Sequence, residues 1–297
     1  MTGDSEQLEY ETTEPVTGEM LGSYEVRKFV ARGGMASVMS ATDVRSKQVV
    51  GIKLLLAVAH DDDARTRFRR EFRALSRLDH PNVLKVYEWG LRNGRPWYSM
   101  ELVTGHDLRQ EVAAWRTLPP GERFVRAQGI LVQVARALSY IHDRGLIHRD
   151  ITPGNIMVRP DGVVKLMDFG VVKDMGADLT AVGSMVGTVS YISPEQIEGS
   201  TLDARADLYS LGAVLYFMLT GNRPFNARTL QGFLEKHLKE IARPPVEVDP
   251  MVPAHLNEVC VRLLSKKPTD RYASAVHLLH VLGDDTQAID VTKRRPP

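Results

Sequence analysis

The sequence predicts an α+β fold, with short strands early in the chain and long apolar helices after them. The apolar runs Val49–Leu55 and Trp97–Val103 have the length and the β-branched or aromatic content of strands. Ala127–Arg144 and Asp207–Leu219 are long, strongly apolar segments of the kind that form buried helices. With 297 residues and 43% hydrophobic content, the chain can bury the core of one two-lobed domain or of two small ones.

The stretch from His148 to Gly170 carries the clearest chemical signal. Asn155 follows Asp150 after five residues, and Asp168 follows thirteen residues later. Two short strands separated by the turn Pro160–Gly162 are expected in between. Carboxylate and amide oxygens suit Mg²⁺, and an aspartate on a loop can accept the proton of an attacking hydroxyl. Each piece alone could be a helix cap or a turn residue, but the set suits metal-assisted phosphoryl transfer.

The HRD motif at 148–150, Asn155 and the DFG motif at 168–170 together resemble the protein-kinase signature. From about Tyr24 to about Leu282 the chain looks like a eukaryotic-like Ser/Thr protein kinase of the bacterial type. The resemblance implies a bilobal kinase fold, with a small β-rich N-lobe containing one main helix and a larger, mostly helical C-lobe. It also implies ATP and Mg²⁺ or Mn²⁺ as cofactors, and transfer to Ser and Thr hydroxyls of proteins in bacterial signalling.

The resemblance assigns most of the nucleotide site to the N-lobe. Lys53 lies inside an apolar strand and is expected to bind the α- and β-phosphates and to pair with Glu71, because an unpaired buried ammonium is costly. Glu71 falls in a helix expected over Arg65–Leu78, where it could instead pair with Arg67 or Arg70. The other residues expected to contact the nucleotide are Val30, Gly33, Val38, Glu101, Val103 and Met157.

Three positions depart from the family pattern. In the glycine-rich loop, Ala31 and Ala36 replace two glycines and only Gly33 matches. We expect a stiffer loop rather than a blocked one, because alanine is the smallest alternative. Thr152 replaces the catalytic-loop lysine and offers a hydrogen bond without a charge, which could lower the rate by roughly 10²–10³. These departures motivate an alternative, an ATP-binding pseudokinase or scaffold with little transfer activity.

An activation segment is expected between the DFG motif and the SPE motif at 193–195. Thr188 stands in a GT-x-x-Y pattern typical of a protein-substrate platform and would bond to Asp150. This pattern disfavours a small-molecule phosphotransferase. Thr180 and Ser184 are the best-placed acceptors for autophosphorylation, although each could instead be an ordinary exposed hydroxyl.

Four residues are expected to support the site rather than to carry chemistry. By the resemblance, Asp207 holds the catalytic-loop backbone and Arg271 pairs with Glu195. Loss of one partner of such a buried pair is strongly destabilising. Arg149 precedes the catalytic aspartate and would pair with a phosphate on the activation segment.

The expected organisation has three parts. An acidic, disordered leader covers residues 1–22, the kinase domain covers 23–283, and a polar and basic tail covers 284–297. Within the kinase domain, the N-lobe covers 23–102 and the C-lobe 103–283.

Composition limits the partners. A net charge of +1 gives no general attraction to nucleic acid or to anionic membranes. No apolar run approaches the ~20 residues of a membrane span. The only cysteine, Cys260, lies in an apolar helical pattern, which favours a buried thiol and a reducing compartment. A cytoplasmic protein is therefore expected.

Two weaker patterns suggest further partners. Thr13, Thr17 and Thr286 each have an aliphatic residue three positions later, similar to ligands of forkhead-associated domains, but the tails could equally be solvated and inert. Arginines recur every four residues from Arg65 to Arg77. Such a stripe is most often a solvated face, or it could support docking of the leader or a homodimer through the N-lobe, as the resemblance suggests.

Overall fold

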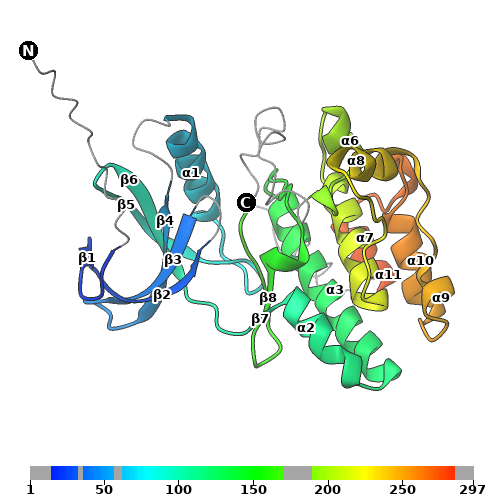
Figure 1. The fold of residues 1–297 in the computed structure, drawn as a ribbon, viewed down its shortest axis with the longest axis horizontal. Coiled ribbons are helices and arrows are strands. Elements are labelled where there is room, and N and C mark those ends of the chain that lie inside the picture. The colour runs from blue at the N-terminus through cyan, green and yellow to red at the C-terminus, as the bar shows by residue number, and fades with distance from the viewer. Residues whose placement is uncertain (1–14, 33–35, 57–61, 170–188, 285–297) are drawn as a thin grey trace, which may run out of the picture. The chain divides into compact units, whose positions relative to one another are not determined.

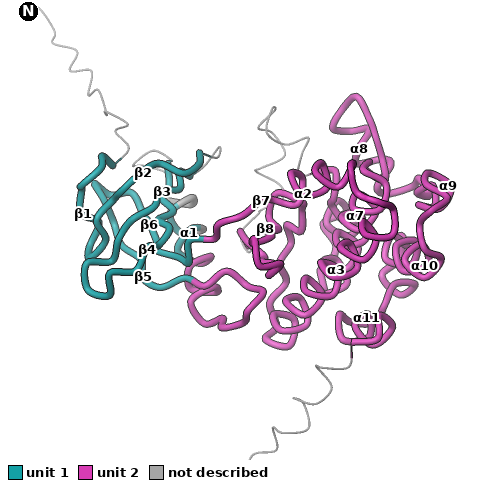
Figure 2. Tube along the Cα trace, turned by 90° about the horizontal axis from the view of Figure 1, so that it is seen from below, with its two compact units in different colours: residues 1–69, 86–102 teal, residues 70–85, 103–297 magenta. Residues whose placement is uncertain are grey.

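The computed structural model describes residues 15–32, 36–56, 62–169 and 189–284. The chain separates into two compact units, which Figure 2 distinguishes by colour. Unit 1 comprises Met1–Arg69 and Val86–Leu102, and unit 2 comprises Arg70–Lys85 and Val103–Pro297.

Unit 1 is built on a six-stranded antiparallel sheet in the order β1-β2-β3-β4-β6-β5 (Figure 1). The strands are β1 Met20–Leu21, β2 Tyr24–Arg32, β3 Ala36–Asp43, β4 Val49–Leu55, β5 Val86–Arg92 and β6 Arg95–Glu101. The turn between β5 and β6 consists of Asn93 and Gly94, with φ of 47° and 74°. Asn-Gly is the sequence that two-residue hairpin turns with positive φ favour, so local chemistry sets this register.

Alternate residues of the central strands carry the core of unit 1. The buried cluster contains Leu21, Tyr24, Val26, Met39, Ala41, Val50, Ile52, Leu54 and Trp97. Tyr24 and Trp97 meet edge to face with their ring centroids 5.8 Å apart. Gly90 of β5 makes room for this indole, because a Cβ at position 90 would lie 2.5 Å from the Trp97 ring. The strand therefore needs a glycine at this position.

The prediction of a disordered leader over 1–22 is wrong for its last part. Strand β1 pairs with β2, and Leu21 is buried in the core. Arg92 of β5 donates to both carboxylate oxygens of Glu19, at 2.5 and 2.9 Å, and this hydrogen bonding lowers the pKa of Glu19. Backbone hydrogen bonds of Gly18 and Glu19 with Val26 add to these contacts, although the average composition of the leader is that of a disordered segment. Residues 1–14 lie outside the described part of the chain.

Helix α1 covers Asp62–Leu75, three residues earlier at each end than the predicted Arg65–Leu78. The chain leaves the helix in a turn in which the N–H of Leu78 bonds to the carbonyl of Leu75. Leu78 remains buried. The apolar spacing therefore continues beyond the last helical residue, and the predicted end falls too late.

Unit 2 combines a small three-stranded sheet, in the order β7-β8-β9, with most of the helices (Figure 1). Its strands are β7 His106–Asp107, β8 Ile156–Val158 and β9 Val164–Leu166. Its α-helices are α2 Leu108–Ala114, α3 Pro120–His142, α6 Pro194–Glu198, α7 Arg205–Thr220, α8 Leu230–Lys239, α9 Pro245–Val248, α10 Ala254–Leu263 and α11 Ala275–Val281. Its described residues also include three short 3₁₀ turns: η1 Trp115–Thr117, η2 Pro153–Asn155 and η3 Pro268–Asp270.

Residues 70–85 belong to unit 2 because they are tied to the β9 strand. The side-chain amide of Asn82 donates to the carbonyl of Val164 at 2.9 Å. The N–H of Leu166 donates to Asn82, and its carbonyl accepts from Leu84. The Tyr140 hydroxyl of α3 accepts from the N–H of Asp79 at 2.8 Å. Hydrogen bonds with α3 and β9, which both follow in the chain, thus hold residues 79–84 in place.

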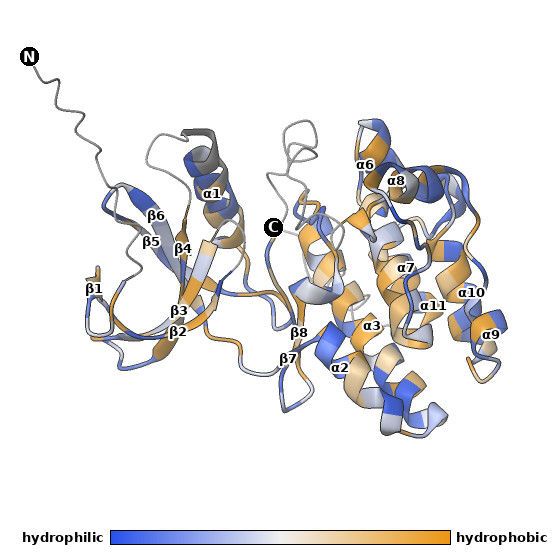
Figure 3. Ribbon diagram, viewed as in Figure 1, coloured by the Kyte–Doolittle hydropathy of each residue, from blue (hydrophilic) through white to orange (hydrophobic). Residues whose placement is uncertain are grey.

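Helix α7 forms the centre of unit 2. Nearly all its residues are buried, and its ribbon is coloured mainly in the hydrophobic range in Figure 3. It packs on α3 and α10. At Gly212 the contact is so close that a Cβ would lie 2.6 Å from the Cβ of Leu263. Cys260 lies in the same contact as a buried free thiol, as predicted, and burial raises its pKa.

Helix α3 begins seven residues before the predicted Ala127. Its first turn contains Pro120 at a position where proline suits a helix start, followed by the polar Glu122 and Arg123. The apolar periodicity on which the prediction relied starts only after this first turn, so the pattern could not indicate where the helix begins. In the part of the chain that the structure describes, no helix has both the length and the hydropathy that crossing a membrane would require.

Candidate active site

Asn155 connects the two acidic residues of the predicted catalytic stretch. Its side-chain Nδ2 donates to the backbone carbonyl and to the carboxylate of Asp150, each at 2.9 Å. Its backbone carbonyl accepts from the N–H of Met167, the residue before Asp168, at 2.8 Å. Because both partners of Nδ2 are acceptors, the amide orientation is defined and Oδ1 points away from Asp150. Asn155 therefore bonds to Asp150 through its side chain and to the residue before Asp168 through its backbone.

Asp168 has a φ of 40°, an uncommon conformation for a residue with a side chain. Its neighbours hold it there. His148 donates from Nε2 to the carbonyl of Met167 at 2.9 Å, and the Phe169 ring lies against the His148 ring with centroids 4.5 Å apart. Such strain costs about 1–3 kcal/mol and persists where surrounding contacts enforce it.

His148 is a buried support of this arrangement. Burial lowers its pKa, although Asp207 and Asp150 act in the opposite direction. A neutral imidazole has one donor and one acceptor, and both are used: Nε2 donates to Met167, and Nδ1 accepts from the N–H of Asp150 at 3.2 Å. The ring thus joins the catalytic-loop backbone to the residue before Asp168.

Asp207 at the start of α7 holds the catalytic loop, as the sequence predicts. Its carboxylate accepts from the N–H groups of His148 and Arg149, each at 2.8 Å. His142 at the end of α3 contacts the same carboxylate at 2.7 Å. Burial alone would raise the pKa of Asp207, but these donors outweigh burial and lower it. Arg149 is thereby held at a φ of 68°.

Arg271 and Glu195 form the predicted buried ion pair. The guanidinium donates to both carboxylate oxygens, at 2.6 and 2.8 Å, and its exposed fraction is 2%. Its remaining donors bond to three backbone carbonyls, those of Arg205, Ser265 and Lys266, each at 2.8 Å. A buried arginine is stable only when its charge and its donors are matched in this way.

Within unit 1, Lys53 is half-buried on β4, paired in register with Val38 on β3 and with Tyr98 on β6. Since side chains alternate along a strand, these three lie on the face opposite to Ile52 and the core cluster. The Lys53 Nζ lies 5.6 Å from the centre of the Tyr98 ring. Glu101 is the last residue of β6.

The remaining predicted site residues have different environments. Thr152 is half-buried and its carbonyl accepts from the N–H of Asn155, while Met157 lies on β8 opposite Lys165. Val30 is exposed on β2. Val103 and Glu71 belong to unit 2, whereas Lys53 belongs to unit 1. Four predicted residues lie outside the described part of the chain: Gly33, Thr180, Ser184 and Thr188.

Two contributors to the site were not predicted. His142 supports Asp207, and Gln196 on α6 donates from Nε2 to the carbonyl of Arg149 at 2.9 Å. The sequence offers one signal for Gln196, which is its position directly after the SPE motif. The residue that it contacts, Arg149, lies 47 positions earlier.

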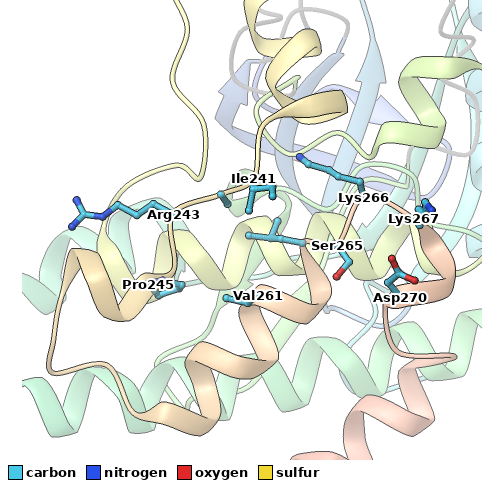
Figure 4. A pocket seen from close by; sticks show the side chains of 10 residues that line it. Ile241, Arg243, Pro245, Val261, Ser265, Lys266, Lys267 and Asp270 are labelled. Carbon is cyan, nitrogen blue, oxygen red and sulfur yellow. The ribbon is translucent and has the colours of Figure 1, made fainter.

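A surface pocket of about 330 Å³ is lined by the segment between α8 and α9 and by the end of α10 (Figure 4). Apolar side chains such as Ile241 and Val261 line it together with Arg243 and Asp270. The residues described around it include none of the predicted site residues, so it is separate from the candidate active site.

The chain matches the family described as "Protein kinase domain" over residues 24–282. It is 38% identical to the probable serine/threonine-protein kinase PknB of Bifidobacterium longum, over 86% of this chain and 38% of that protein. It is 39% identical to the serine/threonine-protein kinase pkn3 of Myxococcus xanthus, over 95% of this chain and 53% of that protein. The crystal structure of the PknI kinase domain of Mycobacterium tuberculosis matches with a TM-score of 0.71 and 29% identity, over 92% of this chain and 100% of that chain.

The chain belongs to the protein kinase family, and among its members it is of the bacterial Ser/Thr type. The α+β kinase fold and the resemblance read from the motifs are thereby confirmed. The chain spans between 38% and 53% of the length of the two curated relatives just named.

Proposed function

We propose that this chain transfers the γ-phosphoryl group of ATP to Ser and Thr hydroxyls of protein substrates. The observation that supports this most directly is the double link made by Asn155, whose amide holds Asp150 while its backbone carbonyl holds the residue before Asp168. Phosphoryl transfer depends mainly on position and charge, so a fixed spacing of these groups is what the reaction requires.

In this proposal Asp150 accepts or orients the proton of the attacking hydroxyl. Asn155 and Asp168 would hold the divalent cation, Mg²⁺ or Mn²⁺, through Oδ1 and a carboxylate oxygen. A donor set of one amide and one carboxylate fits Mg²⁺, which keeps waters and phosphate oxygens among its ligands. When bound, the cation would neutralise charge on the transferring phosphoryl group.

The nucleotide would be bound by the residues that the family pattern assigns to it. Lys53 would pair with the α- and β-phosphates and with Glu71, the backbone of Glu101 and Val103 would meet the adenine edge, and Val38 and Met157 would contact its two faces. Lys53 is half-buried among the buried residues of β4 that follow the exposed Val49, and this position supports a role for its charge.

The pseudokinase alternative rests on Ala31, Ala36 and Thr152. Neither the geometry of the candidate active site nor the similarity to the relatives favours it. Asp150, Asn155 and the His148 support are all in place, and the relatives named above are described as kinases. Thr152 would lower the rate without abolishing transfer, because its carbonyl still closes the η2 turn that carries Asn155.

Autophosphorylation in the activation segment belongs to the same proposal. Thr180 and Ser184 are the proposed sites, and Arg149, held rigidly at its backbone, would receive the phosphate. Binding of forkhead-associated domains to phosphorylated tails, a homodimer through the N-lobe and a cytoplasmic location rest on the sequence patterns alone.

The test is a radiolabelled-ATP transfer assay with Mg²⁺ or Mn²⁺, comparing the wild type with Asp150→Asn and Lys53→Met. Label in the wild type and none in either variant is the expected result, and mapping the labelled sites tests Thr180 and Ser184. A wild type that stays unlabelled although ATP raises its melting temperature would support the pseudokinase instead.

A further inference from the structure

The peptide group between Arg149 and Asp150 is held at both its edges. Its N–H, which belongs to Asp150, donates to Nδ1 of His148 at 3.2 Å. Its carbonyl, which belongs to Arg149, accepts from Nε2 of Gln196 at 2.9 Å. The preceding peptide N–H of Arg149 is bound by Asp207. Because a peptide group is planar, fixing both edges fixes the direction in which the chain enters Asp150.

Gln196 is itself fixed. It is buried, with an exposed fraction of 6%. Its Oε1 accepts from the backbone N–H of Ser193 at 3.1 Å and from the Ser193 hydroxyl at 3.0 Å, which completes a capping box on α6. With Oε1 committed to donors, the amide must present Nε2 to the Arg149 carbonyl.

Helix α6 immediately follows the segment in which the sequence places the phosphorylation sites. The ion pair of Glu195 with Arg271 attaches this helix to the C-terminal part of unit 2. The next residue, Gln196, then reaches back to the catalytic loop. Among the described residues of α6, no other side chain forms a hydrogen bond with that loop.

We propose that Gln196 is a positioning residue, which orients Asp150 through the Arg149 carbonyl and so couples the end of the activation segment to the catalytic aspartate. This inference rests on the proposed kinase function. The competing explanation is that Gln196 only caps α6, and the capping geometry allows the two roles to be separated.

The separating variant is Gln196→Glu. Glutamate is the usual partner in a capping box, so one carboxylate oxygen still accepts from Ser193. The other oxygen would face the Arg149 carbonyl and could not donate to it while ionised. Ser193→Ala is the matched control, because it removes a hydroxyl from the cap and leaves the backbone N–H of Ser193 and the Nε2 contact in place.

We expect kcat of Gln196→Glu to fall about tenfold, less than the roughly 10²–10³ for a lost donor to a reacting group, because Gln196 acts through the Arg149 carbonyl. KM for ATP should change little, and Ser193→Ala should stay near the wild-type kcat. The ratio of variant to wild-type activity should rise as the pH falls, because the protonated carboxyl regains a donor; burial beside a carbonyl oxygen favours that protonated form.

Amide hydrogen exchange at Asp150 supplies a readout that is independent of turnover. Faster exchange in Gln196→Glu but not in Ser193→Ala is expected, even if the wild type proved inactive and the proposed function failed. A wild-type kcat in Gln196→Glu, a loss that is equal in Ser193→Ala, or unchanged exchange at Asp150 would overturn the positioning role.

Discussion

The side-chain amide of Asn155 donates to both the backbone carbonyl and the carboxylate of Asp150, at 2.9 Å in each case. The same side chain is the expected cation ligand. Asn155 therefore has two roles, donor to Asp150 and expected cation ligand, and a substitution can separate them. An aspartate at position 155 could still bind a cation, but its carboxylate could not donate to Asp150.

Asn155→Asp should lower kcat by roughly 10²-fold, because the Nδ2 donor is lost and a second negative charge is placed beside the Asp150 carboxylate. The measurement is phosphoryl transfer across pH, with thermal unfolding as the control for folding. Asn155→Ala removes both roles and should be at least as inactive. Wild-type kcat in Asn155→Asp would show that the donor contacts are dispensable.

Arg271→Met should lower the free energy of unfolding by about 3–5 kcal/mol, because it leaves the buried carboxylate of Glu195 without its partner. The matched control is Arg205→Ala, which removes a more exposed pair with Asp203 and should cost no more than about 1 kcal/mol. Chemical denaturation measures both. Equal costs for the two variants would contradict the assignment of Arg271 as a buried support.

Acid should destabilise the protein partly through His237. This residue is fully buried beside Tyr209, Phe225, Lys266 and the backbone of Ser190, and burial lowers its pKa to about 3. The unfolded chain binds the proton below pH about 6.5 while the folded chain does not. The stability that the neutral His237 ring contributes is therefore complete above pH about 6.5. It is lost as the pH falls toward the pKa of His237 in the folded protein, about 3.

Between pH 7 and pH 5, the decrease in the free energy of unfolding should be smaller in His237→Gln than in the wild type. Urea denaturation at the two pH values checks this. An identical decrease in both proteins would assign the acid sensitivity to other groups.

Gly90→Ala should destabilise the protein by about 1–3 kcal/mol, because the added Cβ would overlap the Trp97 ring at the centre of the unit 1 core. Gly129→Ala serves as the opposite control. Position 129 lies inside α3 with nothing within 4 Å of an added Cβ, so alanine should stabilise by about 0.5–1 kcal/mol. Thermal unfolding of the two variants should move in opposite directions.

Sequence was sufficient for the residues whose chemistry is local. Asp150, Asn155 and Asp168 could be proposed as site residues because phosphoryl transfer restricts both residue type and spacing. Strand β4 matches its predicted apolar run at both ends. The turn of Asn93 and Gly94 likewise carries its conformation in its residue types.

Contacts between distant positions could not be found in this way. Gln196 and His142 meet partners 47 and 65 positions away, and nothing in their immediate neighbours indicates those partners. Glu19, directly before strand β1, pairs with Arg92, which lies 73 positions later. Such residues look ordinary until the fold brings their partners beside them.

The guanidinium of Arg271 binds Glu195, the neighbour of Gln196, and also the carbonyl of Arg205, two positions before Asp207. Both supports of the Arg149 backbone therefore depend on one side chain near the C-terminus. Local opening around Arg271 would release the two supports together, so the catalytic loop and the C-terminal helices should behave as a single cooperative folding unit. A chain truncated before Arg271 would lose its catalytic geometry even if α3 and α7 remained helical.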